Sequence, residues 1–215
     1  GRIETSESSF YVEQMDDSCG AYASLNAGAK ISRGKYLLFL SENLTTGQND
    51  WLEELVMYAE QPNIGAVGGK IFLSDNEHIY ATNYLLRYRE IRREFSGLSR
   101  SVLGDWARER LVRNVTAVPI EMMMVKRDDF FVVQGFDEHF KESLGDVDLC
   151  LRFLKMGRRN VFTPYAEMRL LADPPHKEAI PLNTTEGEYF SRIWADHLQD
   201  KYGHVSYEEG EDDGI

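Results

Sequence analysis

The fold class is decided by GKYLLFLS, residues 34–41. A glycine and a lysine precede a continuous apolar run, and a serine follows it. An apolar run without alternation is typical of a strand that is covered on both faces, as in a parallel sheet between helices. Apolar residues at helical spacing stand before this run at 21–29 and after it at 51–59. We therefore expect an α/β protein in which strands alternate with helices.

The remaining chain continues this alternation. Strands are predicted at 64–72, 115–118, 122–125 and 159–163, the last of them ended by Pro164. Tyr84, Tyr88, Ile91 and Phe95 recur at intervals that are typical of a helix. A last helix is predicted over 185–201, opened by a capping box at Thr185. The acidic tail at 206–215 has a composition typical of disorder.

Length and charge limit the class of protein. The chain has 215 residues, which suits one domain, and we expect that domain to span 1–205. Its 36 acidic and 24 basic residues give a net charge of -12, which argues against nucleic acid as a partner. Cys19 and Cys150 are too few for a disulfide framework and indicate buried thiols in a reducing compartment, hence the cytoplasm.

Two carboxylates mark the candidate chemistry, in GDVDLCLR at 145–152. Asp146 and Asp148 stand where a loop is expected to become a helix that ends at Gly157. The helix dipole favours an ionised carboxylate there, and such a residue can also cap the helix. Asp148 lies about 200° around the helix from Asp146. We therefore expect Asp146 to meet a substrate, with capping as the alternative, and Asp148 to support or cap the site.

Several blocks of the sequence, in order, resemble family 2 glycosyltransferases. The similarity covers roughly 17–166, and any single block would be weak support for it. The matching blocks are GAYASLNAG at 20–28, SRGKYLLFL at 32–40, DWL at 50–52, GAVG at 65–68, GFDE at 135–138, DVDLCLR at 146–152 and the segment 157–164. The resemblance implies a GT-A fold, a Rossmann-like three-layer sandwich with a mostly parallel mixed sheet. It divides the chain into a donor-side half at 17–75 and an acceptor-side half at 114–166.

The activity that the resemblance implies is transfer of a sugar from a nucleotide-diphosphate donor, with inversion at the anomeric carbon. The acceptor would be a glycan or a lipid-linked glycan, as in building a surface polysaccharide. Asp146 matches the family's catalytic base, which takes the proton from the attacking hydroxyl. Asn26, Glu121 and Asp148, together with the strand end at 41–43, are assigned to substrate binding.

The metal motif of the family falls on Ser41, Glu42 and Asn43, where only Glu42 is charged. Mn²⁺ and Mg²⁺ prefer carboxylate oxygens beside a diphosphate, so we expect a divalent cation to bind here weakly or only with the donor. An ordinary polar strand end is the alternative. His176 is either a displaced third ligand or a histidine on a proline-rich surface loop.

The segment 84–113 is expected to be an arginine-rich helical insertion. From position 87 it contains eight arginines and four acidic residues, a local charge of +4. This charge would suit an anionic acceptor or membrane head groups, which would place the protein peripherally at the inner face of the membrane. A solvated helix with paired charges is the alternative.

The resemblance also implies that the front of the donor site is missing. Residues 1–16 are too few for the family's first strand and the loop after it, so the fold is expected to be N-terminally truncated. An exposed sheet edge would favour a homodimer. A second function therefore stays open: a non-catalytic relative that binds glycan, nucleotide or a protein partner.

Overall fold

A central mixed sheet organises the computed structural model of the chain, which describes residues 2–4, 9–11, 15–16, 19–47, 49–87, 89–103, 105–175 and 179–198. The strand order is β3-β10-β5-β11-β4, with β6 also paired to β5 and β9 also paired to β11. The strands are β3 Tyr36–Leu40, β4 Leu44–Thr45, β5 Ile64–Phe72, β6 Ile79–Ala81, β9 Arg113–Val115, β10 Met122–Lys126 and β11 Arg159–Leu170. A separate hairpin joins β1 Arg2–Glu4 to β2 Ser9–Tyr11.

The strand directions confirm the predicted mixed α/β sheet. β5 and β11 pair in parallel, while β10 pairs antiparallel with both β3 and β5. β3, β5 and β11 therefore run in one direction, and β10 is reversed between β3 and β5. β5 is buried along its whole length, as a central strand covered on both faces should be.

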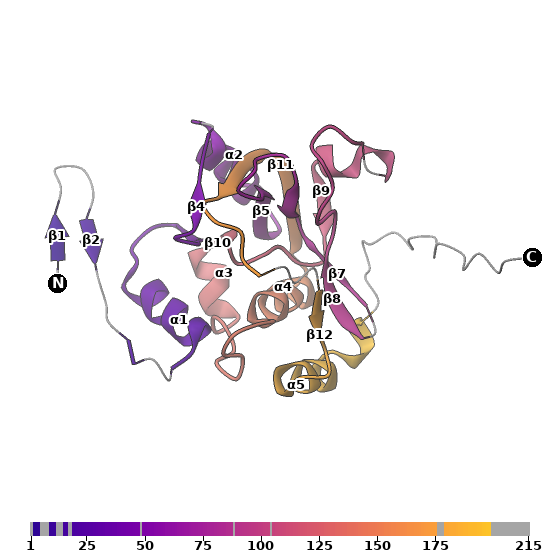
Figure 1. Ribbon diagram of the computed structural model, residues 1–215. Helices are drawn as coiled ribbons and strands as arrows, with labels where there is room; N and C mark the ends of the chain where they lie inside the picture. The colour runs from indigo at the N-terminus through magenta and orange to yellow at the C-terminus, as the bar shows by residue number, and fades with distance from the viewer. Residues whose placement is uncertain are drawn as a thin grey trace, which may run out of the picture.

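Helices cover both faces of this sheet (Figure 1). One hydrophobic core packs α1, α3, α4 and α5 on one side, and a second packs α2 on the other. The helices are α1 Ala21–Ile31, α2 Trp51–Ala59, α3 Arg127–Val132, α4 Gly145–Lys155 and α5 Thr185–Ile193. Short 3₁₀ segments cover Asp105–Arg110 and Ala195–His197. The expected three-layer arrangement is thus present.

A small antiparallel sheet replaces the helix that was expected across 84–95. β7 Tyr84–Leu86 pairs with β8 Glu90–Arg93, which pairs with β12 Ala179–Pro181. The predicted helical insertion at 84–113 is wrong for this reason. The apolar spacing also suits a hairpin, because Tyr84, Leu86 and Ile91 all turn into the core.

Both faces of β3 are covered as predicted, with Leu37 and Phe39 in one core and Tyr36 and Leu38 packed against the other, although the strand lies at one end of the strand order and Leu40 is 45% exposed. Two smaller predictions need correction. β11 does not stop at Pro164 but continues to Leu170, with a register shift against β5. The N-cap of α5 is Thr184 rather than Thr185, and its hydroxyl accepts a hydrogen bond from the N–H of Gly187 at 3.0 Å.

Glycines in β5 serve close packing. A Cβ at Gly68 would lie 2.6 Å from Val118, and one at Gly69 would lie 2.3 Å from the carbonyl oxygen of Ala166. Both distances are shorter than van der Waals contact, so β5 can pack this tightly only where it lacks side chains.

Two predictions fall outside the described residues: His176 as a metal ligand and the acidic tail at 206–215. Within the described ranges, no helix combines the length and apolar character that crossing a bilayer requires.

Candidate active site around Asp146

Asp146 lies in the first turn of α4 and is only 2% exposed. The helix begins at Gly145, and its N-cap is Leu144, which has a positive φ of 68° and no capping side chain. Asp146 is therefore not the N-cap, although its Oδ1 accepts the N–H of Val147 at 2.9 Å. Oδ2 accepts the N–H of Ile120 at 3.1 Å. The carboxylate is fixed between the helix start and the turn that leads into β10.

Burial, followed by the negative charge of Glu121, raises the pKa of Asp146 to about 6. Hydrogen bonds from the N–H groups of Ile120 and Val147 work in the opposite direction, as does the charge of Arg93. A carboxylate with this pKa is largely ionised at neutral pH yet is a stronger base than an exposed aspartate. Asp146 therefore has the proton affinity that a general base requires.

The Asp146 cavity has a volume of about 770 Å³. Glu121, at the turn before β10, lines it together with Asp146. Glu121 Oε1 accepts the hydroxyl of Tyr80 at 3.1 Å and Arg93 Nη2 at 2.8 Å. Its Oε2 is shielded from solvent and has no hydrogen-bond partner among the described residues. Asp146 and Glu121 thus both line the cavity, and Glu121 Oε2 keeps unused acceptor capacity.

Arg93 reaches this cavity from β8. Its guanidinium lies 4.5 Å from the ring centroid of Tyr80 and 5.7 Å from that of Tyr84, both within cation–π range. From the sequence, we placed Arg93 only within an arginine-rich helix and missed Tyr80 and Tyr84 as site residues, because the cavity forms only where the hairpin of β7 and β8 meets the start of α4. The apolar spacing in 84–95 is compatible with a helix and with a hairpin, so it could not indicate this arrangement.

Tyr22 of α1 approaches Asp146 across a glycine. Its hydroxyl donates to Asp146 Oδ1 at 3.2 Å. A Cβ at Gly145 would lie 2.7 Å from the Tyr22 ring, so only glycine leaves room for the ring at this place. Burial, followed by the charge of Asp146, raises the pKa of Tyr22 well above its usual value. Tyr22 therefore stays a neutral hydrogen-bond donor to Asp146.

The loop before Asp146 is held by the carboxylate of Glu186 in α5. Glu186 Oε1 accepts the N–H groups of Lys141 and Glu142, the second at 3.1 Å. Its Oε2 accepts the N–H of Ser143 at 3.0 Å and the Ser143 hydroxyl at 2.8 Å. Partial burial acts to raise the pKa of Glu186, but these hydrogen bonds outweigh it and lower the pKa. An anion at this loop thus fixes the entry to α4.

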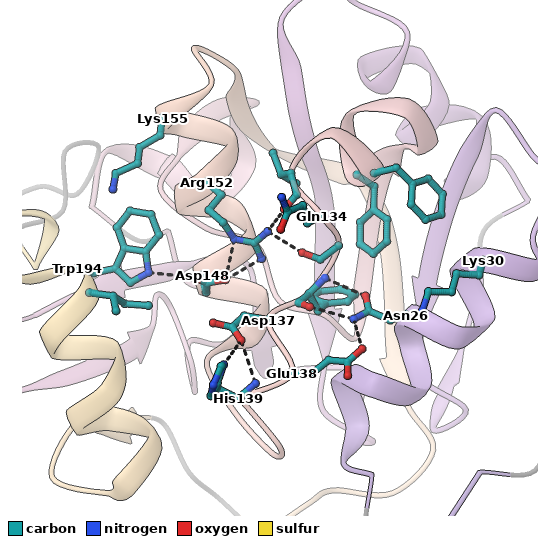
Figure 2. A pocket seen from close by; sticks show the side chains of 16 residues that line it. Asn26, Lys30, Gln134, Asp137, Glu138, His139, Asp148, Arg152, Lys155 and Trp194 are labelled. Atoms are coloured by element: carbon teal, nitrogen blue, oxygen red, sulfur yellow. Dashed lines mark hydrogen bonds and ion pairs between the residues drawn. The ribbon is translucent and has the colours of Figure 1, made fainter.

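Asp148 lies away from the Asp146 cavity, as the helical spacing predicts. Figure 2 shows its carboxylate between Trp194 and Arg152, in a second cavity of about 680 Å³. Oδ1 accepts Trp194 Nε1 at 2.9 Å, and Oδ2 accepts Arg152 Nε at 2.9 Å. These contacts suit the expected supporting role and join α4 to the end of α5.

Asn26 of α1 also borders the second cavity, where it holds the 134–138 turn (Figure 2). Its amide nitrogen donates to the carbonyl of Phe136 at 2.9 Å and to Glu138 at 3.0 Å. Its amide oxygen accepts the N–H of Phe136 at 2.9 Å. The hydrogen-bonding groups of Asn26 are thus used within the protein, in a contact that joins α1 to this turn.

The predicted metal motif lies next to the Asp146 cavity, at the end of β3. The N–H of Ser41 donates to the carbonyl of Glu121 at 3.0 Å, which ties the strand end to that residue. Both amide atoms of Asn43 bond the backbone of Ala172, at 2.8 and 3.2 Å. Glu42 is exposed. The strand end therefore offers one free carboxylate and an amide that is already engaged.

This donor set does not fit a metal site made by the protein alone. Within the described residues, no group of three or more His, Cys, Asp or Glu side chains could hold a metal ion. The proposed chemistry below therefore rests on Asp146 and not on a metal ion.

The arginines of 84–113 are mostly paired with carboxylates. Arg93 pairs with Glu121, while Arg108 and Arg113 both pair with Glu94 at 3.1 and 2.5 Å. Arg100 pairs with Glu167 at 3.2 Å. This pairing supports the alternative to an anion-binding segment, in which the charges of the arginines and the carboxylates offset one another. The paired residues lie in strands and loops rather than in a helix.

Comparison with proteins of known sequence finds two relatives that are much longer than this chain. Protein y4gI of Sinorhizobium fredii, described as uncharacterized, is 29% identical over 185 residues, which are 82% of this chain and 20% of that protein. The O-antigen biosynthesis protein RfbC of Myxococcus xanthus is 31% identical over 147 residues, which are 68% of this chain and 11% of that protein. No protein-family model matches the sequence.

Solved structures establish the fold. The mannosyltransferase PcManGT from Pyrobaculum calidifontis, in complex with GDP-Man and Mn²⁺, superposes with a TM-score of 0.53 at 16% identity, over 78% of this chain and 40% of that one. GalNAc-T7 with UDP, GalNAc and Mn²⁺ gives 0.60 at 14% identity, over 84% of this chain and 36% of that one. The chain has the GT-A fold of these glycosyltransferases.

Proposed function

We propose that this chain is a glycosyltransferase domain that acts in polysaccharide biosynthesis. It would transfer a sugar from a nucleotide-diphosphate donor to a hydroxyl of a glycan or lipid-linked acceptor. The GT-A fold and the similarity to RfbC support the class of reaction. The single observation that carries the proposal is the buried Asp146 carboxylate at a cavity, with a pKa of about 6.

Asp146 is the proposed general base. The acceptor oxygen attacks the anomeric carbon as its proton passes to a carboxylate oxygen of Asp146. Oδ2 accepts one hydrogen bond, from Ile120, and so has a lone pair left for this proton. The bond from the anomeric carbon to the phosphate oxygen breaks, and the nucleoside diphosphate leaves with the bonding electrons. Attack opposite the leaving group inverts the anomeric carbon, as expected for family 2.

The donor side of the proposal is the strand end at Ser41, Glu42 and Asn43. A divalent cation is expected to bind there together with the donor's phosphates, because Glu42 alone supplies a free carboxylate. Glu42, Asn43 and His176 remain the ligands proposed from the sequence.

Transfer assays with UDP- and GDP-sugars and mixed glycoside acceptors test the proposal. We expect kcat/KM to rise with pH through about 6, because the free enzyme needs ionised Asp146. The Asp146→Asn variant keeps the size of the side chain and removes the base, so it should lower kcat by about 10²–10⁴-fold. Asp128→Asn is the matched control, because it neutralises an exposed carboxylate in the first turn of α3, and it should leave kcat unchanged. Asp148→Asn is less suitable, because it breaks contacts to α5. Transfer that survives in Asp146→Asn would refute the assignment.

One observation favours the second function, a non-catalytic domain that binds glycan or nucleotide. The Asn43 amide is engaged by Ala172 on both sides, which leaves the strand end poorly supplied with metal ligands. Calorimetry with UDP and GDP, with and without Mn²⁺, distinguishes the two functions. Nucleotide binding without transfer for any acceptor would favour the second.

A further inference from the structure

The lining of the Asp146 cavity contains more acidic than basic side chains. It has four carboxylates and two cations: Glu121, Glu142, Asp146 and Glu186 against Arg93 and Lys141. Arg93 is paired with Glu121 at 2.8 Å, which leaves Lys141, an exposed residue whose Nζ donates only to the carbonyl of Cys19 at 3.5 Å, as the one cation of the lining without a described carboxylate partner. A carboxylate or phosphate group entering this cavity would therefore meet more negative than positive charge.

The uncharged part of the lining suits a sugar ring. Pro174, Pro175 and Pro181 supply flat apolar surfaces against which the C–H face of a pyranose can pack, while the largely buried rings of Tyr22, Tyr80 and Tyr84 form the apolar wall behind them. Polar groups at such sites fix orientation, while the apolar walls exclude water. The cavity volume of about 770 Å³ falls within the range of small-molecule sites.

Glu121 Oε2 supplies the orienting group. This oxygen is buried and has no hydrogen-bond partner among the described residues, which is unfavourable for a carboxylate. Oε1 already accepts hydrogen bonds from Tyr80 and Arg93, so Oε2 is the oxygen of Glu121 that is left for a ligand at the cavity. A hydroxyl donor from a ligand would satisfy Oε2, whereas an anionic group would not.

We propose that Glu121 determines acceptor specificity: the Asp146 cavity takes an uncharged sugar, and Glu121 accepts a hydrogen bond from a second hydroxyl of that sugar. The attacking hydroxyl faces Asp146, and the second hydroxyl fixes the orientation of the ring. Arg93 acts as a positioning residue, because it holds Glu121 and is itself neutralised by it. The assignment of the cavity to the acceptor rests on the proposed function, but the preference for uncharged sugars does not need turnover.

Binding of matched glycosides to the 215-residue chain tests this specificity. The probes are the methyl glycosides of glucose, galactose and mannose, each compared with its uronide, which differs by a carboxylate in place of the CH₂OH group. Affinities are measured by ligand-observed NMR without donor. We expect at least one neutral glycoside to bind about tenfold or more tightly than its uronide, the ratio that about 1.4 kcal/mol of repulsion would give.

Two variants assign the preference to Glu121. Glu121→Gln removes the charge and should reduce the ratio of neutral to uronide affinity by about tenfold. Glu121→Asp keeps the charge but shortens the reach, so it should weaken neutral glycosides while still rejecting uronides. The matched control is Glu188→Gln, an exposed glutamate of α5 outside the cavity lining, which should leave the ratio unchanged. Thermal unfolding checks that each variant is folded.

The outcomes separate this proposal from the proposed function. Uronides that bind as well as neutral glycosides, the absence of glycoside binding, or an unchanged ratio in both Glu121 variants would overturn the specificity. Failure of transfer with every donor would instead refute the proposed glycosyltransferase activity. The preference for neutral glycosides would still be tested by the binding measurements. Transfer to neutral acceptors that depends on Asp146, with discrimination that depends on Glu121, supports both.

Discussion

Glu186 accepts two hydrogen bonds from Ser143, one from the backbone N–H at 3.0 Å and one from the hydroxyl at 2.8 Å. Ser143 stands three residues before Asp146, so a side chain of α5 fixes the loop that delivers the proposed base. The same carboxylate also bonds the N–H groups of Lys141 and Glu142. The position of Asp146 therefore depends on a contact between α5 and a loop residue that is 43 positions away in the sequence.

Replacing Glu186 by alanine should destabilise the protein by about 1–3 kcal/mol, because several N–H donors lose their acceptor. The pKa of Glu186 is lowered in the folded state, so its contribution is complete above the ordinary glutamate pKa of about 4.3. The contribution is lost as the pH falls through the lower folded-state pKa. Urea unfolding from pH 3 to pH 7 measures this. Glu188→Ala is the control, and equal losses in both variants at every pH would contradict the prediction.

Asp146→Asn should become more stable relative to the wild type as the pH rises. The pKa of Asp146 is raised, so its protonated form stabilises the fold fully below the unfolded pKa of about 3.9 and this contribution disappears as the pH passes about 6. Asparagine does not titrate, so the difference should move in its favour by about 3 kcal/mol between pH 3.5 and pH 7. Unfolding free energies measured at both pH values check this, and a constant difference would show that Asp146 is not perturbed.

Gly145→Ala should displace Tyr22. The new Cβ would lie 2.7 Å from the ring, and the resulting shift should cost about 1–3 kcal/mol and weaken the Tyr22 hydrogen bond to Asp146. The matched control is Gly28→Ala in α1, where nothing lies within 4 Å of the new Cβ. That variant should gain about 0.5–1 kcal/mol from helix propensity. Thermal unfolding compares the stabilities of the two variants, and equal stability changes would mean that the Tyr22 ring moves aside without cost.

Asn43→Asp should strengthen metal binding at the strand end. It would place a second carboxylate beside Glu42, while losing the hydrogen bond that the amide donates to Ala172. We expect tighter Mn²⁺ binding by calorimetry together with a stability loss of about 1 kcal/mol. Asn49→Asp adds the same charge at an exposed position and serves as the control. Equal Mn²⁺ affinities in the two variants would show that this strand end does not coordinate the ion.

The sequence predicted the scaffold well where a single pattern could determine it. The strand at 36–40, the buried strand at 64–72 and the helix that follows Asp146 are all present, since each is a local apolar pattern. The helix ends as predicted, with Gly157 at a positive φ of 79°. The separation of Asp146 from Asp148 also followed from helical geometry alone.

The rest of the site depends on contacts between distant segments. Tyr84 and Arg93 were expected on a helix, but long-range pairing with β12 makes this segment a hairpin that brings Arg93 to Glu121. Nothing local distinguishes Glu121 from an ordinary turn residue. The roles of Asn26 and Asn43 likewise become visible only through their partners at Phe136 and Ala172. Local periodicity contains no information about such partners.

The ties of α5 have a consequence for engineering this protein. Glu186 accepts a hydrogen bond from Ser143, and Trp194, at the end of the helix, donates one to Asp148. The chain is therefore anchored to α5 on both sides of Asp146. A chimera that transplanted only 114–166 into another scaffold would carry the aspartate without its two anchors. Exchanging acceptor modules between related proteins should therefore succeed only when 184–198 are transferred with them, because the portable unit is discontinuous in sequence.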